Sequence, residues 1–358
     1  MTLEDLGWTG ARAEEFARAA SGKSDLFPGR IAVEYNQILR VYVEDGEWEA
    51  VISGRMKHTA ERRAELPAVG DWVVLRRRGD ERRAAVVEVL PRAGYFSRKV
   101  AGVVTDEQVV AANIDLAFIV TSLDADFSPR RLERYLLVAR EGGVQPVVLL
   151  TKPDKCDDVP ARVSDAVTVA GEAPVLVVNP RSGEGMEKVV AHLSRGRTSV
   201  LLGSSGVGKS TIVNHLVGRD VRRTQEVRAE DAKGRHTTTH RELVEVPAGG
   251  WLIDTPGMRE LQLWEVGDGF RQSFDDVEAL AARCHFSNCR HLDEPRCAVK
   301  EAVESGTLLS GRLESYQALQ QELQHLEAQQ TERLRLEGRR RAKVMTKALR
   351  AHLKQKGR

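Results

Sequence analysis

The organisation of this chain follows from one stretch, Val200-Leu201-Leu202-Gly203-Ser204-Ser205-Gly206-Val207-Gly208-Lys209-Ser210-Thr211. An apolar run typical of a buried β-strand enters a loop of the form G-x-x-x-x-G-K-S. Apolar residues with helical spacing follow at Ile212, Val213 and Leu216. A strand, this loop and a helix in that order make a P-loop, which cradles phosphates. We therefore expect the chain to bind a nucleoside triphosphate.

The P-loop predicts a role for each kind of side chain in it. Its glycines let consecutive backbone N–H groups turn toward a phosphate, and the following helix adds positive partial charge. Lys209 is expected to stabilise phosphate charge, and the Ser210 hydroxyl to hold Mg²⁺. The predicted nucleotide-binding residues of this loop are Gly203, Ser204, Ser205, Gly206, Val207, Gly208, Lys209, Ser210 and Thr211.

Length and composition favour a globular protein of several domains. The 358 residues are too many for one ordinary core and predict two or three domains. Hydrophobic residues make up 41% and charged residues 30%, and no apolar run approaches the roughly 18 residues of a membrane span. The N-terminus carries Glu4 and Asp5 and lacks a signal-peptide pattern. We expect a cytoplasmic monomer with no membrane contact.

Charge and cysteine are unevenly distributed along the chain. The formal net charge is only +2, yet residues 331–358 contain eleven Lys or Arg against two Glu. Three of the four cysteines lie between Cys284 and Cys297. In a cytoplasmic chain, such clustering favours a metal site over disulfides.

The N-terminal third has the pattern of a small β-barrel. A helical lead-in with Thr9 as its N-cap comes first, and short β-type segments divided by Gly, Asp and Pro follow. Asp45-Gly46 predicts a hairpin between two of them. Five short strands in roughly seventy residues favour an OB-fold. The predicted strands are Arg30–Val33, Ile38–Val43, Trp48–Ile52, Asp71–Leu75 and Ala84–Val89.

Two connections of this barrel are rich in basic residues, which leaves two interpretations open. One is an RNA-binding surface. The other is ordinary solvated loops, because acidic neighbours such as Glu61 and Glu81 dilute the charge. The basic residues are Arg55, Lys57, His58, Arg62 and Arg63 in the first connection, and Arg76, Arg77, Arg78, Arg82 and Arg83 in the second.

From about Ala111 the pattern alternates between strands and helices. Ser128-Pro129 opens a predicted helix that stops at Gly142-Gly143, and Met186–Leu193 is predicted as another. This alternation favours a parallel sheet covered by helices on both faces. The strands predicted for the sheet are Ile114–Val120, Val147–Leu150, Val175–Val178, Val200–Leu202 and Trp251–Ile253.

Two further motifs extend the predicted phosphate site. Asp254-Thr255-Pro256-Gly257 has the form D-x-x-G at a strand end, so Asp254 would reach Mg²⁺ through water and the Gly257 N–H would contact a γ-phosphate. The stretch 234–239 lies between this motif and the P-loop. It is of the kind that supplies a switch threonine to Mg²⁺, here Thr238 or Thr239.

A base-recognition motif precedes the P-loop in the chain. Thr151-Lys152-Pro153-Asp154 follows the strand Val147–Leu150 and resembles the guanine clamp N-K-x-D. The Asp154 carboxylate can accept two hydrogen bonds from guanine, whereas adenine would leave it unpaired. Thr151 replaces an Asn whose amide can brace the P-loop, so we expect that brace to be missing. Guanine stays the favoured base, and a P-loop ATPase or kinase is the alternative. The stretch 179–183 is placed to act as a backbone loop against the base.

The residue after D-x-x-G bears on hydrolysis. Many GTPases have a Gln there that orients the attacking water, but this chain has Met258, whose thioether cannot. We therefore expect slow hydrolysis by the isolated protein. His236, beside the switch threonines, either orients the water or is a solvated loop residue; the sequence leaves both open.

The spacing Cys284-x₄-Cys289-x-His291-x₅-Cys297 predicts a zinc site. Three thiolates and one imidazole complete a tetrahedral set with no open position for a substrate water, so the site is expected to be structural. His285 is a poorer ligand because it is adjacent to Cys284. The alternative is three buried free cysteines and a surface histidine.

The order of the nucleotide motifs is unusual. Most small GTPases place the base clamp last, whereas here it precedes the P-loop, so the domain is circularly permuted. With this order, with Pro67-Ala68-Val69-Gly70-Asp71, with residues 234–239 and with the cysteine cluster, the chain resembles the ribosome small-subunit-dependent GTPase A family, also called the YjeQ family. The resemblance covers nearly the whole chain and also favours His291 as the fourth zinc ligand.

The resemblance implies a GTPase that converts GTP to GDP and phosphate with Mg²⁺ and one structural Zn²⁺. It implies docking on the small ribosomal subunit and its rRNA late in maturation, beside other assembly factors, with stimulation by the subunit. A rival of another class is an RNA-binding module with an inert nucleotide site. The expected architecture is an N-terminal OB-fold β-barrel, a central α/β P-loop GTPase domain and a C-terminal zinc-binding, mainly helical domain. The expected boundaries are 1–28 for the lead-in, 29–100 for the OB-fold, 105–266 for the permuted GTPase domain, 267–330 for the zinc-binding helical domain and 331–358 for the basic tail.

Overall fold

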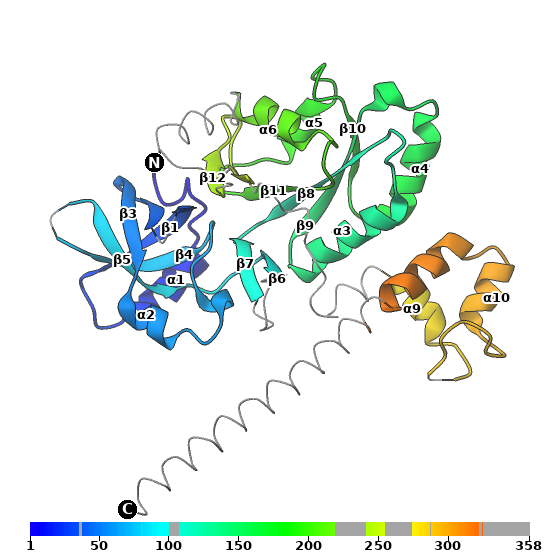
Figure 1. Ribbon diagram of the computed structural model, residues 1–358, viewed down its shortest axis with the longest axis horizontal. Helices are drawn as coiled ribbons and strands as arrows, with labels where there is room; N and C mark the ends of the chain where they lie inside the picture. Colours follow the sequence, from blue (N-terminus) through cyan, green and yellow to red (C-terminus); the bar gives the residue numbers. More distant parts are fainter. Residues whose placement is uncertain are drawn as a thin grey trace, which may run out of the picture. The chain divides into compact units, whose positions relative to one another are not determined.

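The computed structural model describes residues 1–35, 38–79, 81–99, 107–218, 241–254, 274–286, 288–321 and 324. These residues belong to two compact units (Figure 1). Nearly all described residues up to Asp254 lie in the first unit, and those from Phe274 onward lie in the second. The finer domain boundaries expected from the sequence remain predictions.

Five N-terminal strands close into a barrel, which confirms the predicted OB-like architecture. They are β1 (Leu26–Tyr35), β2 (Ile38–Val43), β3 (Gly46–Ile52), β4 (Trp72–Arg77) and β5 (Arg83–Val89). Their hydrogen-bonded order is β1-β2-β3-β5-β4, and β4 pairs back with β1 to close the barrel. The connection from β3 to β4, expected as a loop, contains the short helix α2 (Gly54–Thr59) and a single turn, η1 (Arg63–Glu65).

The hairpin between β2 and β3 shows how the sequence directs the barrel. β2 alternates between buried and less buried positions, so Leu39, Val41 and Val43 enter the core. Gly46 has φ +122°, a conformation that favours glycine, and it pairs with Val43 across the turn. The Trp48 indole N–H donates to the Asp45 carboxylate at 2.7 Å and fixes the turn.

The central region forms the predicted sheet. Its parallel strands are β8 (Leu116–Ser122), β9 (Gln145–Thr151), β10 (Val175–Val178), β11 (Thr198–Leu202) and β13 (Trp251–Asp254). β12 (Glu242–Glu245) runs antiparallel to β13 and also pairs with β1 of the barrel. The strand order is β10-β9-β8-β11-β13-β12. Every residue of β8 is buried, as expected for a strand covered on both faces.

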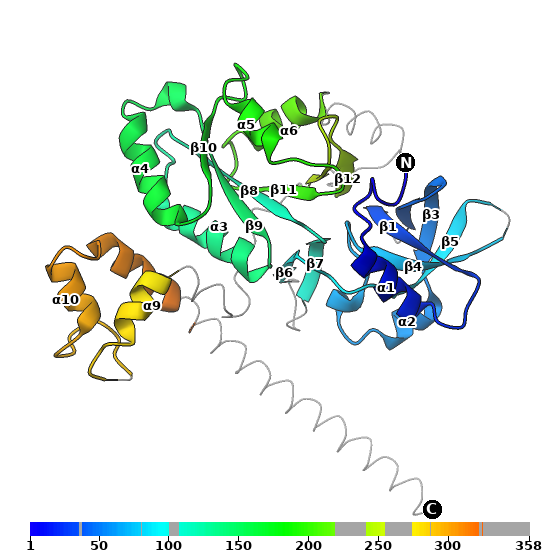
Figure 2. The same ribbon diagram turned by 180° about the vertical axis from the view of Figure 1, so that it is seen from behind.

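Helices lie on both sides of this sheet (Figures 1 and 2). On one side, α5 (Met186–Ala191) and α6 (Lys209–Val217) share a core cluster with Phe118 and Val120 of β8. On the other side, α3 (Pro129–Glu141) packs against β8, β9 and α4 (Val159–Ala170). Ser128 caps α3 by accepting from the Arg131 N–H at 3.4 Å, so the predicted start of this helix is confirmed.

The N-terminal residues are more than a lead-in. Thr9 caps α1 (Gly10–Ala19) as expected, but Leu6 ahead of it is fully buried. Trp8 packs edge-on against Trp72 of the barrel, with ring centroids 4.8 Å apart. On the sheet side, the Trp251 indole N–H donates to the carbonyl of Asp5 at 2.7 Å. This segment therefore contacts both the barrel and the sheet.

Arg30 of β1 is a completely buried charge at the junction of barrel and sheet. Its guanidinium donates to the carbonyls of Leu6, Gly70 and Asn113 and to the Thr198 hydroxyl, at 2.5 to 3.2 Å. Burial lowers the pKa of Arg30 to about 10, so the group stays protonated at neutral pH. One side chain thus links the N-terminal segment, a barrel turn and the first residue of β11.

Helices and the irregular segment between the first two of them make up the described residues of the second unit. The unit contains α9 (Asp275–Ala281), α10 (Ala298–Glu304) and a helical stretch from residue 310 to 321. That stretch packs on α9, because Arg312 donates to the Asp276 carboxylate at 3.0 Å and the Tyr316 hydroxyl donates to Glu278 at 2.9 Å. Across the described part of the chain, helices are too short or too polar to span a bilayer.

Candidate nucleotide-binding site and metal centre

The sheet topology brings the predicted nucleotide motifs to one edge. β8 lies between β9 and β11, and all three run parallel, so their carboxyl ends share an edge. The P-loop follows β11 and the base clamp follows β9. From β8 the chain continues outward to β9 and β10, whereas β11 lies on the other side of β8. A crevice for ligands is expected at such a reversal of strand order.

The P-loop has the backbone that phosphate binding requires. Gly203 has φ +141°, and a Cβ there would lie 2.2 Å from the carbonyl oxygen of Val120, so only glycine fits. Gly208 has φ +102° and caps the N-terminus of α6. The Lys209 ammonium donates to the carbonyls of Gly203 and Ser204 at 2.6 and 2.5 Å. Its charge therefore lies within the loop, where it can stabilise a bound phosphate.

Thr151 corrects one expectation from the sequence. The hydroxyl of this fully buried residue donates to the carbonyl of Val207, inside the P-loop, at 2.6 Å. The Thr121 carbonyl lies farther away, at 3.3 Å. The prediction that Thr151 leaves the P-loop without a brace is wrong, because the Thr151 hydroxyl supplies the contact that an Asn amide would make. This hydrogen bond therefore joins the predicted base clamp to the P-loop, although 56 residues separate the two partners.

The rest of the clamp is held by two polar contacts that the sequence did not predict. The Lys152 ammonium donates to the Asp124 carboxylate at 2.6 Å. The Asn179 amide donates to the Asp154 carboxylate at 3.2 Å. Asn179 follows β10, so the loop predicted to face the base contributes a side chain as well as backbone. The two partners, Asp124 and Asn179, each follow a parallel strand whose carboxyl end lies at this edge of the sheet. Their place in the sequence could therefore have indicated them, but their residue types alone could not.

The switch residues lie mostly outside the described part of the chain. This applies to His236, Thr238, Thr239 and Gly257. The backbone of Asp254 is described, and it ends β13. Because β13 runs parallel to β11, this residue reaches the same edge of the sheet as the P-loop.

The second unit brings the four predicted metal ligands together. One ligand atom from each of Cys284, Cys289, His291 and Cys297 lies within 4.8 Å of all the others. The His291 Nδ1 is 3.7 Å from the Sγ of Cys284 and 3.4 Å from that of Cys297, and the two sulfurs are 3.9 Å apart. His285 instead packs its ring against Phe286. The ring of His291 is the one that points at the thiols.

These spacings match a tetrahedral metal site. Metal–sulfur bonds of about 2.3 Å and metal–nitrogen bonds of about 2.0–2.1 Å put two sulfurs about 3.8 Å apart and sulfur about 3.5 Å from nitrogen. Burial lowers the pKa of His291 and so favours neutral imidazole, which is the ligand form. His291 has φ +59°, a backbone conformation that is uncommon for residues other than glycine.

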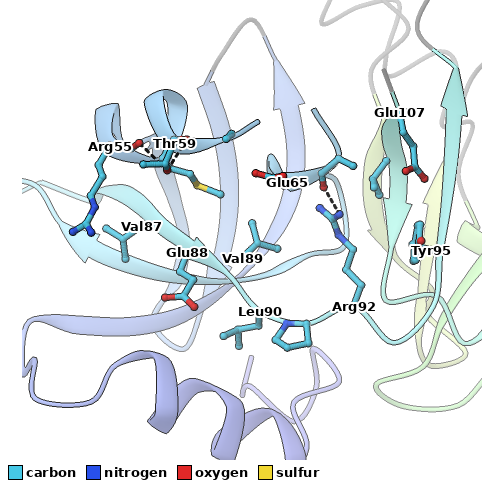
Figure 3. Close-up of a pocket in the computed structure, with 15 residues that line it drawn as sticks. Arg55, Thr59, Glu65, Val87, Glu88, Val89, Leu90, Arg92, Tyr95 and Glu107 are labelled. Atoms are coloured by element: carbon cyan, nitrogen blue, oxygen red, sulfur yellow. Dashed lines mark hydrogen bonds between the residues drawn. The ribbon is translucent and has the colours of Figure 1, made fainter. Parts of the chain in front are cut away.

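A cavity of about 640 Å³ lies beside the barrel, between α2, β5 and an unpredicted sheet of β6 (Tyr95–Lys99) and β7 (Glu107–Ala112) (Figure 3). Arg92 lies on its wall and donates to both carboxylate oxygens of Asp71, at 2.8 and 2.7 Å. Asp71 ends the segment 67–71, whose role here is to anchor the barrel wall. None of the predicted nucleotide or metal residues lines this cavity.

Comparison with known proteins agrees with this geometry. The family model "RsgA GTPase" matches residues 89–264. "Small ribosomal subunit biogenesis GTPase RsgA 1" of Oceanobacillus iheyensis is 44% identical over 91% of this chain and 93% of its own. The protein of that name from Listeria innocua is 40% identical over 99% of both chains.

Solved structures agree on the fold. The structure described as "Crystal structure of YjeQ from Thermotoga maritima" superimposes with a TM-score of 0.63 at 25% identity, over 83% of this chain and 98% of that one. The one described as "The crystal structure of YloQ, a circularly permuted GTPase" gives a TM-score of 0.61 at 23% identity, over 85% and 97%. With a predicted base clamp that precedes its P-loop in the chain and adjoins it in space, this chain belongs to the RsgA GTPase family of circularly permuted GTPases.

Proposed function

We propose that this chain is a GTPase of small ribosomal subunit biogenesis, which binds the maturing subunit and its rRNA and hydrolyses GTP to time its release. The observation that carries the nucleotide assignment is the 2.6 Å bond from Thr151 to Val207, because it joins a guanine-type clamp to the P-loop. The names of the relatives that align over nearly the whole chain support the ribosomal part of the proposal.

Each site residue has a role in this proposal. P-loop N–H groups and Lys209 bind the β- and γ-phosphates, and Asp154 selects guanine by accepting from its N1–H and exocyclic amine. Ser210 and a switch threonine, Thr238 or Thr239, would hold Mg²⁺, and Asp254 would contact it through water. When bound, Mg²⁺ neutralises charge on the phosphate oxygens.

Hydrolysis needs a water molecule held in line with the γ-phosphate. Met258 follows D-x-x-G and cannot orient that water, so the isolated protein is slow. In this proposal His236 orients the water when the subunit is bound, and the Gly257 N–H contacts the γ-phosphate.

The Cys₃His cluster binds one structural zinc ion in this proposal. All four ligands come from the protein, which leaves no position for a substrate water. Bound zinc would stabilise the second unit by joining Cys284, which follows α9, to Cys297, the N-cap residue of α10.

The barrel offers a surface for rRNA. Arg76 pairs with Asp25, and Arg83 pairs with Glu81, so the second basic group is partly neutralised. Both groups are exposed, including Arg55 of α2 and Arg78 after β4. We assign the rRNA contact to these two exposed basic groups.

The test measures phosphate release by the purified full chain, alone and with purified small subunits. We expect GTP but not ATP to compete for a fluorescent GDP analogue, and subunits to accelerate release at least about tenfold, which is roughly 1.4 kcal/mol of barrier. Equal competition by ATP would contradict the guanine clamp. An unchanged rate with subunits would contradict the ribosomal role.

A further inference from the structure

Asp124 lies at the nucleotide edge of the sheet but belongs to none of the motifs that define a GTPase. It follows β8 by two residues, in the turn before α3. Because β8 lies between β9 and β11, the end of β8 lies between the base clamp and the P-loop. A side chain from this turn can therefore reach the clamp.

Three donors hold the Asp124 carboxylate in place. Its Oδ1 accepts from the Ser122 hydroxyl at 2.7 Å and from the Asp126 N–H at 3.1 Å. Its Oδ2 accepts from the Lys152 ammonium at 2.6 Å. The hydrogen bond from Lys152 lowers the pKa of Asp124 to about 2, so the carboxylate is charged under all working conditions. The turn thus presents a fixed negative charge to Lys152.

Lys152 is held in an unusual backbone conformation. It has φ 56° and ψ 48°, which is the left-handed region, and it precedes a proline. Non-glycine residues rarely adopt this conformation, and an outlier of this kind points to a function that the surrounding structure maintains. With Thr151 bound to the P-loop and Asp154 held by Asn179, the ion pair completes a set of contacts that holds all three polar side chains of the predicted clamp.

We propose that Asp124 is a positioning residue for guanine recognition: it holds Lys152 in the conformation in which the clamp receives the base. A lysine side chain has large rotamer entropy, and a free one would have to be ordered during binding. Asp124 imposes that order beforehand, so binding loses less conformational freedom. The proposal rests on the assignment of residues 151–154 as the guanine clamp.

The test compares Asp124→Asn with wild type in the full chain. Asparagine keeps the shape of the side chain and its acceptor oxygen but removes the charge that holds Lys152. We expect the Kd for GDP to rise about tenfold, since a freely rotating lysine must then be ordered on binding. Inorganic tripolyphosphate, which occupies only the phosphate site, should bind both proteins equally. Asp126→Asn is the matched control: it removes a carboxylate from the same turn that pairs with Arg131, and GDP should bind it as wild type does.

A double-mutant cycle with Lys152→Met tests whether Asp124 acts through Lys152. If it does, Asp124→Asn adds no further loss of GDP affinity in the Lys152→Met background. Wild-type GDP affinity in Asp124→Asn would overturn the proposal, as would additive losses in the cycle. An equal loss of tripolyphosphate affinity would also overturn it, because that loss indicates general damage to the site. If wild type itself fails to prefer GTP over ATP, the clamp assignment fails instead, which is a separate result.

Discussion

Replacing Thr151 with valine tests the bond that joins the base clamp to the P-loop. Valine has nearly the same shape as threonine and lacks the hydroxyl that donates to Val207 at 2.6 Å. A neutral hydrogen bond of this kind contributes about 0.5–1.5 kcal/mol, and a buried carbonyl left without its donor costs about 1–3 kcal/mol. Because Thr151 is fully buried, water cannot easily replace the hydroxyl.

The bond supports the P-loop itself, so its loss should affect every ligand of that loop. We expect Thr151→Val to weaken GDP binding about tenfold, equivalent to about 1.4 kcal/mol. Inorganic tripolyphosphate should weaken to the same extent, unlike the pattern expected for Asp124→Asn. Titration of a fluorescent GDP analogue, with tripolyphosphate as competitor, measures both affinities.

Ser199→Ala is the matched control for this experiment. The Ser199 hydroxyl is also buried and donates to the Trp251 carbonyl at 3.0 Å, in the strand that leads to the P-loop. Its loss should lower stability by a similar amount without changing nucleotide affinity. If Thr151→Val binds both ligands as wild type does, the hydroxyl does not support the P-loop. If Ser199→Ala weakens binding equally, the effect is general destabilisation.

Three further predictions concern the metal centre, the buried arginine and hydrolysis. Cys289→Ser should abolish zinc content and unfold the second unit with little change in GTP affinity, measured by metal analysis and thermal unfolding; unaltered unfolding would contradict this. Arg30→Met should lower the free energy of unfolding in urea by about 3 kcal/mol or more, because it leaves buried carbonyls without a donor. As a control, Arg40→Met removes exposed ion pairs and should lower the free energy of unfolding by less than about 1 kcal/mol. His236→Ala should lose most of the stimulation by small subunits while GTP affinity stays the same; full stimulation would show that another group places the water.

The parts of the fold that the sequence predicted are those with strong local patterns. Continuous apolar runs marked the parallel strands, and Asp45-Gly46 marked the hairpin, because a few neighbouring residues determine each of them. The buried role of Leu6 and Arg30 could not be predicted in the same way. Arg30 is a charged residue in a barrel strand, and its acceptors come from residues 6, 70, 113 and 198. Such a contact depends on the complete fold.

The β6–β7 sheet and helix α2 were missed for a different reason. α2 has six residues and buries none of them, so it leaves no apolar periodicity in the sequence. β6 and β7 are short and pair with each other across residues 100–106, without a turn signal such as Asn-Gly. Weak patterns of this kind are overridden by tertiary packing.

The predicted base clamp shows why a single residue of a motif can be misjudged from residue types alone. The N-K-x-D pattern records residue types, and by that standard Thr151 is a departure. The Val207 carbonyl, however, needs only a hydrogen-bond donor at the end of β9, and a threonine hydroxyl satisfies it as an amide does. The Thr151 hydroxyl reaches Val207 because β9 and β11 both pair in parallel with β8, one on each side of it. This arrangement is the same whichever of the two strands comes first in the chain. The same arrangement explains why permutation leaves the site intact: the sheet sets which strand ends meet, and a new order of connections preserves those neighbours.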